Sequence, residues 1–168
     1  MIEALPRNII RFFILVLLQV LVFNNMELDN AVQPYIYTLF ILLLPFETPG
    51  WVLLLTGFSL GFSIDVFSET LGMHTIATTT MAFLRPYVLT VISPRDGYET
   101  SSLPRVHYYG LSWFIKYALI LLIAHHLVLF IVEIFRFQDM FRILLHTIFS
   151  SVFTLIFIVL SQFFVFRK

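Results

Sequence analysis

Cysteine is absent from this chain of 168 residues. Its absence excludes disulfides, thiolate metal sites and cysteine nucleophiles. Charged residues are scarce as well, at 12%, whereas a soluble globular domain carries about 25%. The formal net charge is zero, so the overall charge gives no reason to expect a nucleic-acid partner. No polar stretch is long enough for a separate aqueous domain, and we therefore expect one domain over residues 1–168.

Apolar residues replace the missing charge. They make up 60% of the chain, with 20 phenylalanines, and they gather in long runs. This pattern predicts an all-α membrane protein, a bundle of six transmembrane helices. The first run lacks the small-residue cleavage site of a signal peptide, so we expect it to remain as a span. The predicted spans cover about residues 9–23, 33–46, 51–67, 73–92, 111–134 and 140–166.

The second span is unusually short. As a helix, Tyr35 to Phe46 would extend about 18 Å, against a hydrocarbon core of roughly 30 Å. We therefore expect either tilted neighbours that cover this helix or a locally thinner bilayer.

Basic residues predict the orientation, because they are enriched on the cytoplasmic side. With both termini in the cytoplasm, eight of the ten lie inside and two lie outside. The inner set is Arg7, Arg11, Arg85, Arg95, Arg105, Lys116, Arg167 and Lys168, and the outer set is Arg136 and Arg142.

The third span carries a stripe of small residues that ends in a carboxylate. Gly57, Gly61 and Asp65 recur every four residues and share one helix face. The two glycines permit close approach of another helix, so we interpret them as a groove for a partner. A carboxylate at hydrocarbon depth costs roughly 2.5–3.5 kcal/mol on insertion scales, which makes Asp65 a functional candidate. The alternative is that Asp65 lies at the outer interface and caps the following turn with Ser68 and Thr70.

The fourth span has a polar side formed by His74, Thr78 and Arg85. Such a face favours another helix or a water-filled cavity over lipid. Threonine hydroxyls also bond to the carbonyl four residues earlier, so the threonines alone do not define a site. Arg85, which precedes Pro86 near the far end of the span, is interpreted as an interfacial guanidinium.

Two other groups of polar residues favour structural roles. His125 and His126 point about 100° apart on a helix, so they do not form the i, i+4 pair of a metal site. We expect one of them to bond Gln19, a threonine or a backbone carbonyl across the bundle. Glu133 and Arg136 are three residues apart and predict an exposed ion pair, which contributes about 0–1 kcal/mol.

Motifs of hydrolases are missing. The chain has no G-x-S-x-G, no H-E-x-x-H and no glycine-rich phosphate loop. We therefore expect no enzymatic activity, no cofactor and no metal.

Several strings along the whole chain resemble one family. They are Leu-Leu-Leu-Pro-Phe-Glu-Thr-Pro (42–49), Gly-x-x-x-Gly-x-x-x-Asp (57–65), Gly72-x-His74, Phe-Leu-Arg-Pro (83–86), Ser-Pro-Arg-Asp-Gly-Tyr-Glu (93–99) and Phe-Arg-Phe (135–137). This set is similar to the MreD family of rod shape-determining proteins, in the form seen in Bacteroidetes.

The resemblance implies a multi-pass component of the bacterial inner membrane, with no known enzymatic activity, that supports cell elongation and peptidoglycan synthesis. Its implied partners are the bitopic protein MreC, the RodA glycosyltransferase with its transpeptidase, and the MreB cytoskeleton. The implied fold is similar to the substrate-binding subunits of energy-coupling-factor vitamin transporters.

Together, the residues and the resemblance give a leading hypothesis and an alternative. The leading hypothesis is a scaffold that binds MreC through the third and fourth spans, at Gly57, Gly61, Asp65, His74, Thr78 and Arg85. The loop residues Arg95, Asp96 and Arg105 are expected to contact a cytoplasmic partner. The alternative is a small-molecule-binding subunit of a transporter, with Asp65 and His74 in its pocket. A lipid-handling role is a third interpretation, for which the chain shows no internal ladder of charges.

Overall fold

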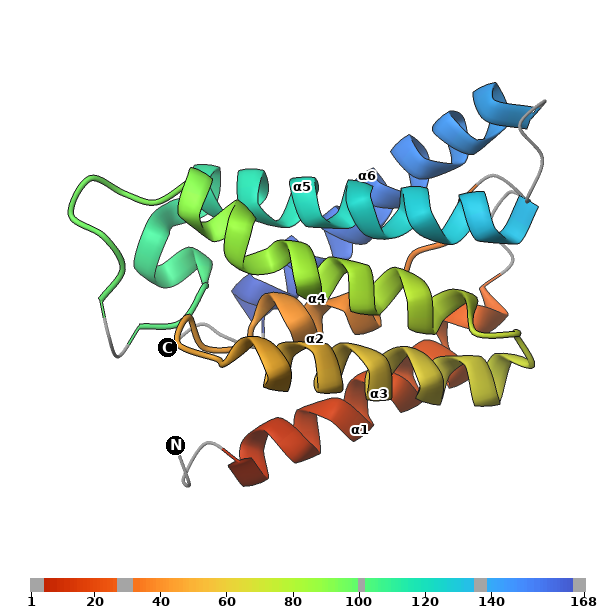
Figure 1. Cartoon of the computed structure of the whole chain (residues 1–168), viewed down its shortest axis with the longest axis horizontal. Coiled ribbons are helices and arrows are strands. Elements are labelled where there is room, and N and C mark those ends of the chain that lie inside the picture. Colours follow the sequence, from red (N-terminus) through yellow and green to blue (C-terminus); the bar gives the residue numbers. More distant parts are fainter. Residues whose placement is uncertain (1–4, 27–31, 100–101, 135–138, 165–168) are drawn as a thin grey trace.

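The computed structural model describes residues 5–26, 32–99, 102–134 and 139–164, and in these ranges all regular secondary structure is helical. Figure 1 shows a bundle of long helices with short helical elements among them. The elements are α1 (Leu5–Leu21), η2 (Phe23–Asn25), η3 (Ile36–Thr38), α2 (Leu39–Leu42), α3 (Gly50–Ser68), α4 (Met73–Val91), α5 (Val106–Ile134) and α6 (Met140–Phe164).

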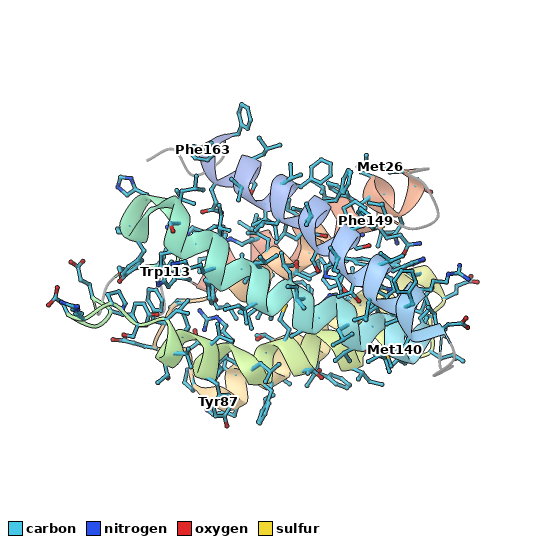
Figure 2. The ribbon with its side chains drawn as sticks, turned by 90° about the horizontal axis from the view of Figure 1, so that it is seen from above. Met26, Tyr87, Trp113, Met140, Phe149 and Phe163 are labelled. Atoms are coloured by element: carbon cyan, nitrogen blue, oxygen red, sulfur yellow. The ribbon has the colours of Figure 1, made fainter. Side chains whose placement is uncertain are left out.

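Four of the helices are long and apolar enough to cross a membrane. The qualifying stretches are Pro6–Asn25, Gly50–Ser68, Val106–Ile134 and Met140–Phe164. Their outer faces carry large exposed apolar side chains, such as Phe13 on α1 and Phe163 on α6, which projects outward in Figure 2. An apolar surface of this extent is unusual in water and typical of a protein in contact with lipid. The chain therefore has the character of a membrane protein.

The two ends of the bundle differ, and we name each by its connection. Figure 1 shows that α1 begins, α4 ends, α5 begins and α6 ends on the side of residues 92–99 and 102–105, which we call the loop end. Residues 69–72, between α3 and α4, lie at the opposite end, which we call the turn end. The predicted third and fourth spans thus form an antiparallel hairpin.

The predicted second span differs most from expectation. A continuous helix over 33–46 was wrong, because the helical part covers only η3 and α2, and residues 32–35 have no regular structure. Every residue from Tyr35 to Leu44 is buried, with at most 6% of its surface exposed. Since protein surrounds this segment on all sides, its length need not match the bilayer. Backbone without regular structure is tolerated at membrane depth in such a setting, provided that its polar groups find partners.

The predicted fifth span also has an irregularity. The helix begins at Val106 rather than at residue 111, and Gly110 interrupts it with a φ of 80°. A residue with a side chain is strained at this φ, whereas glycine adopts it readily. The first turn of α5 is thereby set at an angle to the rest.

Candidate functional site

The glycine stripe of α3 is occupied by α4. A Cβ atom built on Gly61 would lie 2.5 Å from the carbonyl oxygen of His74, and one on Gly57 would lie 2.8 Å from Cβ of Ala82. The glycines therefore allow α3 and α4 to pack backbone against backbone. The interpretation of Gly57 and Gly61 as an open groove for a partner protein is corrected accordingly, because a helix of the same chain fills that groove.

Asp65 caps the N-terminus of α4. Its carboxylate accepts hydrogen bonds from the backbone N–H groups of His74 (3.1 Å) and Thr75 (2.9 Å). The hydroxyls of Thr70 and Thr75 each donate another at 2.5 Å. These bonds satisfy donors at a helix start that have no intrahelical partner, and the helix dipole favours the negative charge. Asp65 thus fulfils the capping alternative with Thr70, whereas Ser68 instead accepts a bond from Asn24.

His74 belongs to a buried relay of three side chains. The Tyr37 hydroxyl lies 2.9 Å from Nδ1 of His74 and 2.9 Å from Nε2 of His125. It joins the buried segment 35–44, which we call the central segment, to α4 and α5. All three side chains are at least nine-tenths buried, and a hydroxyl can donate to one imidazole and accept from the other. Thr78, also on this face, donates to the carbonyl of His74 at 2.6 Å, so its hydroxyl is used within α4.

His126 supports the non-helical backbone of the central segment. Its Nδ1 lies 2.7 Å from the carbonyl oxygen of Leu122, which requires a proton on Nδ1 and leaves Nε2 as an acceptor. Thr154 of α6 lies 3.3 Å from that Nε2, and its hydroxyl oxygen accepts the backbone N–H of Tyr35 at 3.0 Å. The prediction that one of the two histidines bonds a threonine or a carbonyl across the bundle is confirmed.

Arg85 lies inside the bundle rather than at an interface. Its side chain is fully buried, and its guanidinium donates to the carbonyls of Leu44 and Pro45 and, at 2.8 Å, to the hydroxyl of Tyr117. Tyr117 in turn donates to the carbonyl of Leu42 at 3.0 Å. These two side chains satisfy the carbonyls where α2 ends. The interpretation of Arg85 as an interfacial guanidinium was wrong.

Aromatic rings fix the loop end. Phe46 and Tyr98 stack with centroids 4.2 Å apart, and Tyr109 and Trp113 pack against both rings. The Tyr98 hydroxyl donates to the carbonyl of Leu89 at 2.8 Å, and burial raises the pKa of Tyr98 to about 12, so the hydroxyl stays protonated at neutral pH. The described part of the connection between α4 and α5 is therefore held against both helices.

The loop residues of the predicted partner contact lie beside this aromatic cluster. Arg95 and Asp96 are exposed at a tight turn, in which the N–H of Gly97 donates to the carbonyl of Pro94 at 3.0 Å. Arg105 is half-buried just before α5, and burial lowers its pKa. The turn thus presents one charge of each sign from a fixed base.

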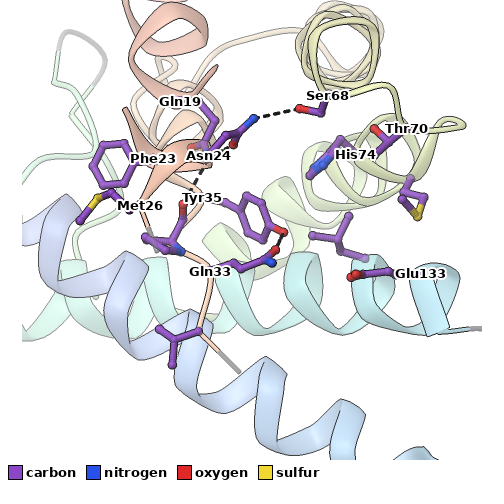
Figure 3. A pocket seen from close by; sticks show the side chains of 14 residues that line it. Gln19, Phe23, Asn24, Met26, Gln33, Tyr35, Ser68, Thr70, His74 and Glu133 are labelled. Carbon is purple, nitrogen blue, oxygen red and sulfur yellow. Dashed lines mark hydrogen bonds between the residues drawn. The ribbon is translucent and has the colours of Figure 1, made fainter. Parts of the chain in front are cut away.

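A cavity of about 610 Å³ opens at the turn end. It lies next to the relay of Tyr37, and both Tyr35 and His74 contribute to its wall (Figure 3). Its lining is formed by Gln19, Phe23, Asn24, Met26, Val32, Gln33, Pro34, Tyr35, Ser68, Thr70, Met73, His74, Leu129 and Glu133. A volume of this size is in the range of small-molecule sites, about 300–1,000 Å³.

The structure divides the predicted site residues between the two ends. Asp65, His74 and Thr78 lie toward the turn end, while Arg85, Arg95, Asp96 and Arg105 lie toward the loop end. Arg136 and the string 135–137 fall outside the described residues. The structure adds three hydrogen-bonded groups whose pairings the sequence did not indicate, which contain Tyr37, Tyr117, and His126 with Thr154. Polar residues inside apolar runs were the available signal for them.

Comparisons of the chain with protein-family models, with curated proteins and with solved structures gave no match.

Proposed function

We propose that this chain is a non-enzymatic membrane scaffold of the MreD kind, which binds a bitopic partner of the MreC type. In this role it supports cell elongation and peptidoglycan synthesis in a bacterial inner membrane. RodA with its transpeptidase and the MreB cytoskeleton are the further partners that the proposal includes.

One observation carries the proposal: three strings of the resemblance contact one another at the loop end. Arg85 of the string 83–86 binds carbonyls of Leu44 and Pro45 in the string 42–49. Tyr98 of the string 93–99 stacks on Phe46 of that same string. A chance likeness among apolar runs gives no reason for separate strings to meet in space. Their contact supports the view that these strings form one structural unit.

The proposed topology has six crossings. The four apolar helices supply four, α4 supplies the fifth, and the central segment, which is buried by its neighbours, supplies the sixth. Arg7 and Arg11 near the start of α1 lie at the same end as Arg95 and Arg105. The preference of basic residues for the cytoplasm supports an orientation with the loop end and both termini inside.

Partner contacts in this proposal lie on the outside of the bundle. Asp65, His74, Thr78 and Arg85 already have partners within the chain, so they hold the scaffold in shape. The exposed apolar face of α1, which includes Ile10 and Phe13, is available to a transmembrane helix of the bitopic partner. Arg95 and Asp96 are available to a cytoplasmic partner.

The test is gentle purification of the tagged chain from its native membrane, with bound proteins identified by mass spectrometry. We expect an MreC-type protein and the elongation synthase. The double variant Arg95→Ala, Asp96→Ala should lower recovery of the cytoskeletal partner, and Arg142→Ala, an exposed arginine at the other end, should not. Recovery of none of these proteins by a folded wild-type chain would overturn the proposal.

The cavity favours a second candidate, a small-molecule-binding subunit of a transporter. It opens at the turn end, which is the outer side in the proposed orientation, and it combines polar and apolar lining. The implied similarity to energy-coupling-factor subunits points to the same function. An ATPase module and a stoichiometric metabolite in the purified sample would favour this candidate over the scaffold.

A further inference from the structure

Gln19, which lines the cavity at the turn end, carries a buried acceptor without a donor. Gln19 is 1% exposed, and its side-chain nitrogen donates to Asn24 Oδ1 at 2.9 Å and to the carbonyl of Pro34 at 3.2 Å. Its Oε1 atom is buried and has no hydrogen-bond partner among the described residues. Buried polar atoms are nearly always paired, so the unpaired oxygen of this lining residue leaves an acceptor available to a ligand that reaches it.

Glu133 supplies negative charge to the same cavity. Among the described residues it is the one acidic side chain in the lining, it is exposed, and none of them forms an ion pair or a hydrogen bond with it. Figure 3 shows Glu133 and Gln19 beside the bonded pair Gln33 and Tyr35, so two acceptor-bearing side chains from different helices, α5 and α1, line the cavity. Acceptors of this kind select a ligand that carries positive charge and N–H donors.

Apolar side chains complete the wall. Phe23, Met26 and Leu129 lie among the lining residues, so the cavity accommodates an apolar body beside the polar group. We propose that this cavity binds a primary ammonium group on a small or lipid-borne ligand, with Glu133 as the counter-ion. The sources of such a group are the headgroup of phosphatidylethanolamine and a free primary amine. The inference rests on the cavity alone and stands whichever of the two proposed functions is correct.

The experiment compares two lipids that differ in N–H donors but not in net charge. The purified full-length chain in detergent is incubated with equal amounts of phosphatidylethanolamine and phosphatidylcholine, and native mass spectrometry counts the bound lipids. The variants are Glu133→Gln and the control Glu69→Gln, an exposed carboxylate at the turn end that does not line the cavity. Ethanolamine is added in excess as the competitor.

We expect the wild-type chain and Glu69→Gln to retain phosphatidylethanolamine about tenfold over phosphatidylcholine, and Glu133→Gln to lose about tenfold of that preference. Displacement by ethanolamine would assign the site to free amines, and lack of displacement would assign it to the lipid headgroup. A further outcome is that ethanolamine binds while neither lipid is retained. In that case, loss of ethanolamine binding in Glu133→Gln would assign the ammonium site to free amines. Equal retention of both lipids without an ethanolamine site, or a preference that survives Glu133→Gln, would overturn the proposal. Partner recovery is a separate measurement, so failure here leaves the scaffold proposal unaffected.

Discussion

The carboxylate of Asp65 binds Thr75 twice, through the backbone N–H at 2.9 Å and the hydroxyl at 2.5 Å. This contact ties the last turn of α3 to the first turn of α4 across a connection of only four residues, 69–72. Asp65, which its depth in the span made a functional candidate, is therefore a helix cap. Its hydrogen bonds within the bundle serve the hairpin.

Removal of this cap should destabilise the hairpin. We expect Asp65→Ala to lower the free energy of unfolding by about 1–3 kcal/mol, because it leaves two N–H groups and two hydroxyls without their acceptor. Asp65→Asn should cost less, since an amide oxygen also caps helices. Denaturant or thermal unfolding in detergent gives the comparison, with the exposed Asp96→Asn as control. An Asp65→Ala protein as stable as the wild type would show that the cap is dispensable.

The glycines of α3 should differ in their tolerance of a methyl group. Gly61→Ala places Cβ 2.5 Å from backbone atoms of His74 and Thr75, which cannot move without shifting α4, whereas Gly57→Ala meets the side chain of Ala82 first, at 2.8 Å. Overpacking costs about 1–3 kcal/mol, and we expect the larger loss at Gly61. Gly50→Ala is the matched control, because no atom lies within 4 Å of its added Cβ. Equal melting temperatures for all three variants would argue against close packing of α3 on α4.

How far the sequence predicts this molecule depends on the kind of signal. Long apolar runs predict the long outer helices. The predicted spans 51–67, 73–92 and 111–134 correspond to α3, α4 and most of α5. The short segment around Tyr35 and Leu44 carries the same apolar signal, yet protein rather than lipid surrounds it. Composition does not distinguish these two apolar environments, so the prediction of a full-length helix failed there.

For the polar residues, the sequence predicts the helix face on which they lie but not their interaction partners. Spacing placed Gly57, Gly61 and Asp65 on one face correctly, but it did not indicate which helix that face meets. Arg85 was assigned to an interface because a charge prefers water, and its carbonyl partners at Leu44 and Pro45 come from a segment 40 residues earlier. Such pairings depend on the tertiary fold, which a single sequence does not specify by periodicity.

The pair Arg85 and Tyr117 should be energetically coupled. Both side chains donate to the carbonyls at the end of α2, and the guanidinium also donates to the Tyr117 hydroxyl. We expect Tyr117→Phe to cost about 1–3 kcal/mol, because it leaves the carbonyl of Leu42 without that donor. A double-mutant cycle with Arg85→Lys should give a coupling of about 0.5–3 kcal/mol. Strict additivity of the two substitutions would contradict a shared network.

The Tyr37 relay should matter more than the neighbouring tyrosine. Tyr37→Phe leaves Nδ1 of His74 and Nε2 of His125 unpaired in the interior, at a cost of about 1–3 kcal/mol. Tyr35→Phe removes a hydroxyl that bonds Gln33 at the cavity, where water can replace it, and should cost less. Unfolding of the two variants under identical conditions provides the measurement. A larger loss for Tyr35→Phe would reverse the assignment of the relay as the structural centre.

The loop end should show an alkaline transition that depends on Tyr98. Burial raises the pKa of this hydroxyl from its usual 10.0 to about 12 in the folded chain. The unfolded chain therefore releases its proton at lower pH than the folded chain, so the contribution of Tyr98 to stability is fully present below pH 10 and is lost as the pH rises toward 12. Tyr98→Phe should remove this pH dependence while it keeps the ring stacked on Phe46. Base-catalysed amide hydrogen exchange is too fast between pH 9 and 11 to report on the loop. We would therefore follow unfolding by the near-ultraviolet absorbance of tyrosinate. If the alkaline transition were unchanged in Tyr98→Phe, it would belong to other tyrosines, and Tyr98 would not contribute to the pH dependence of stability.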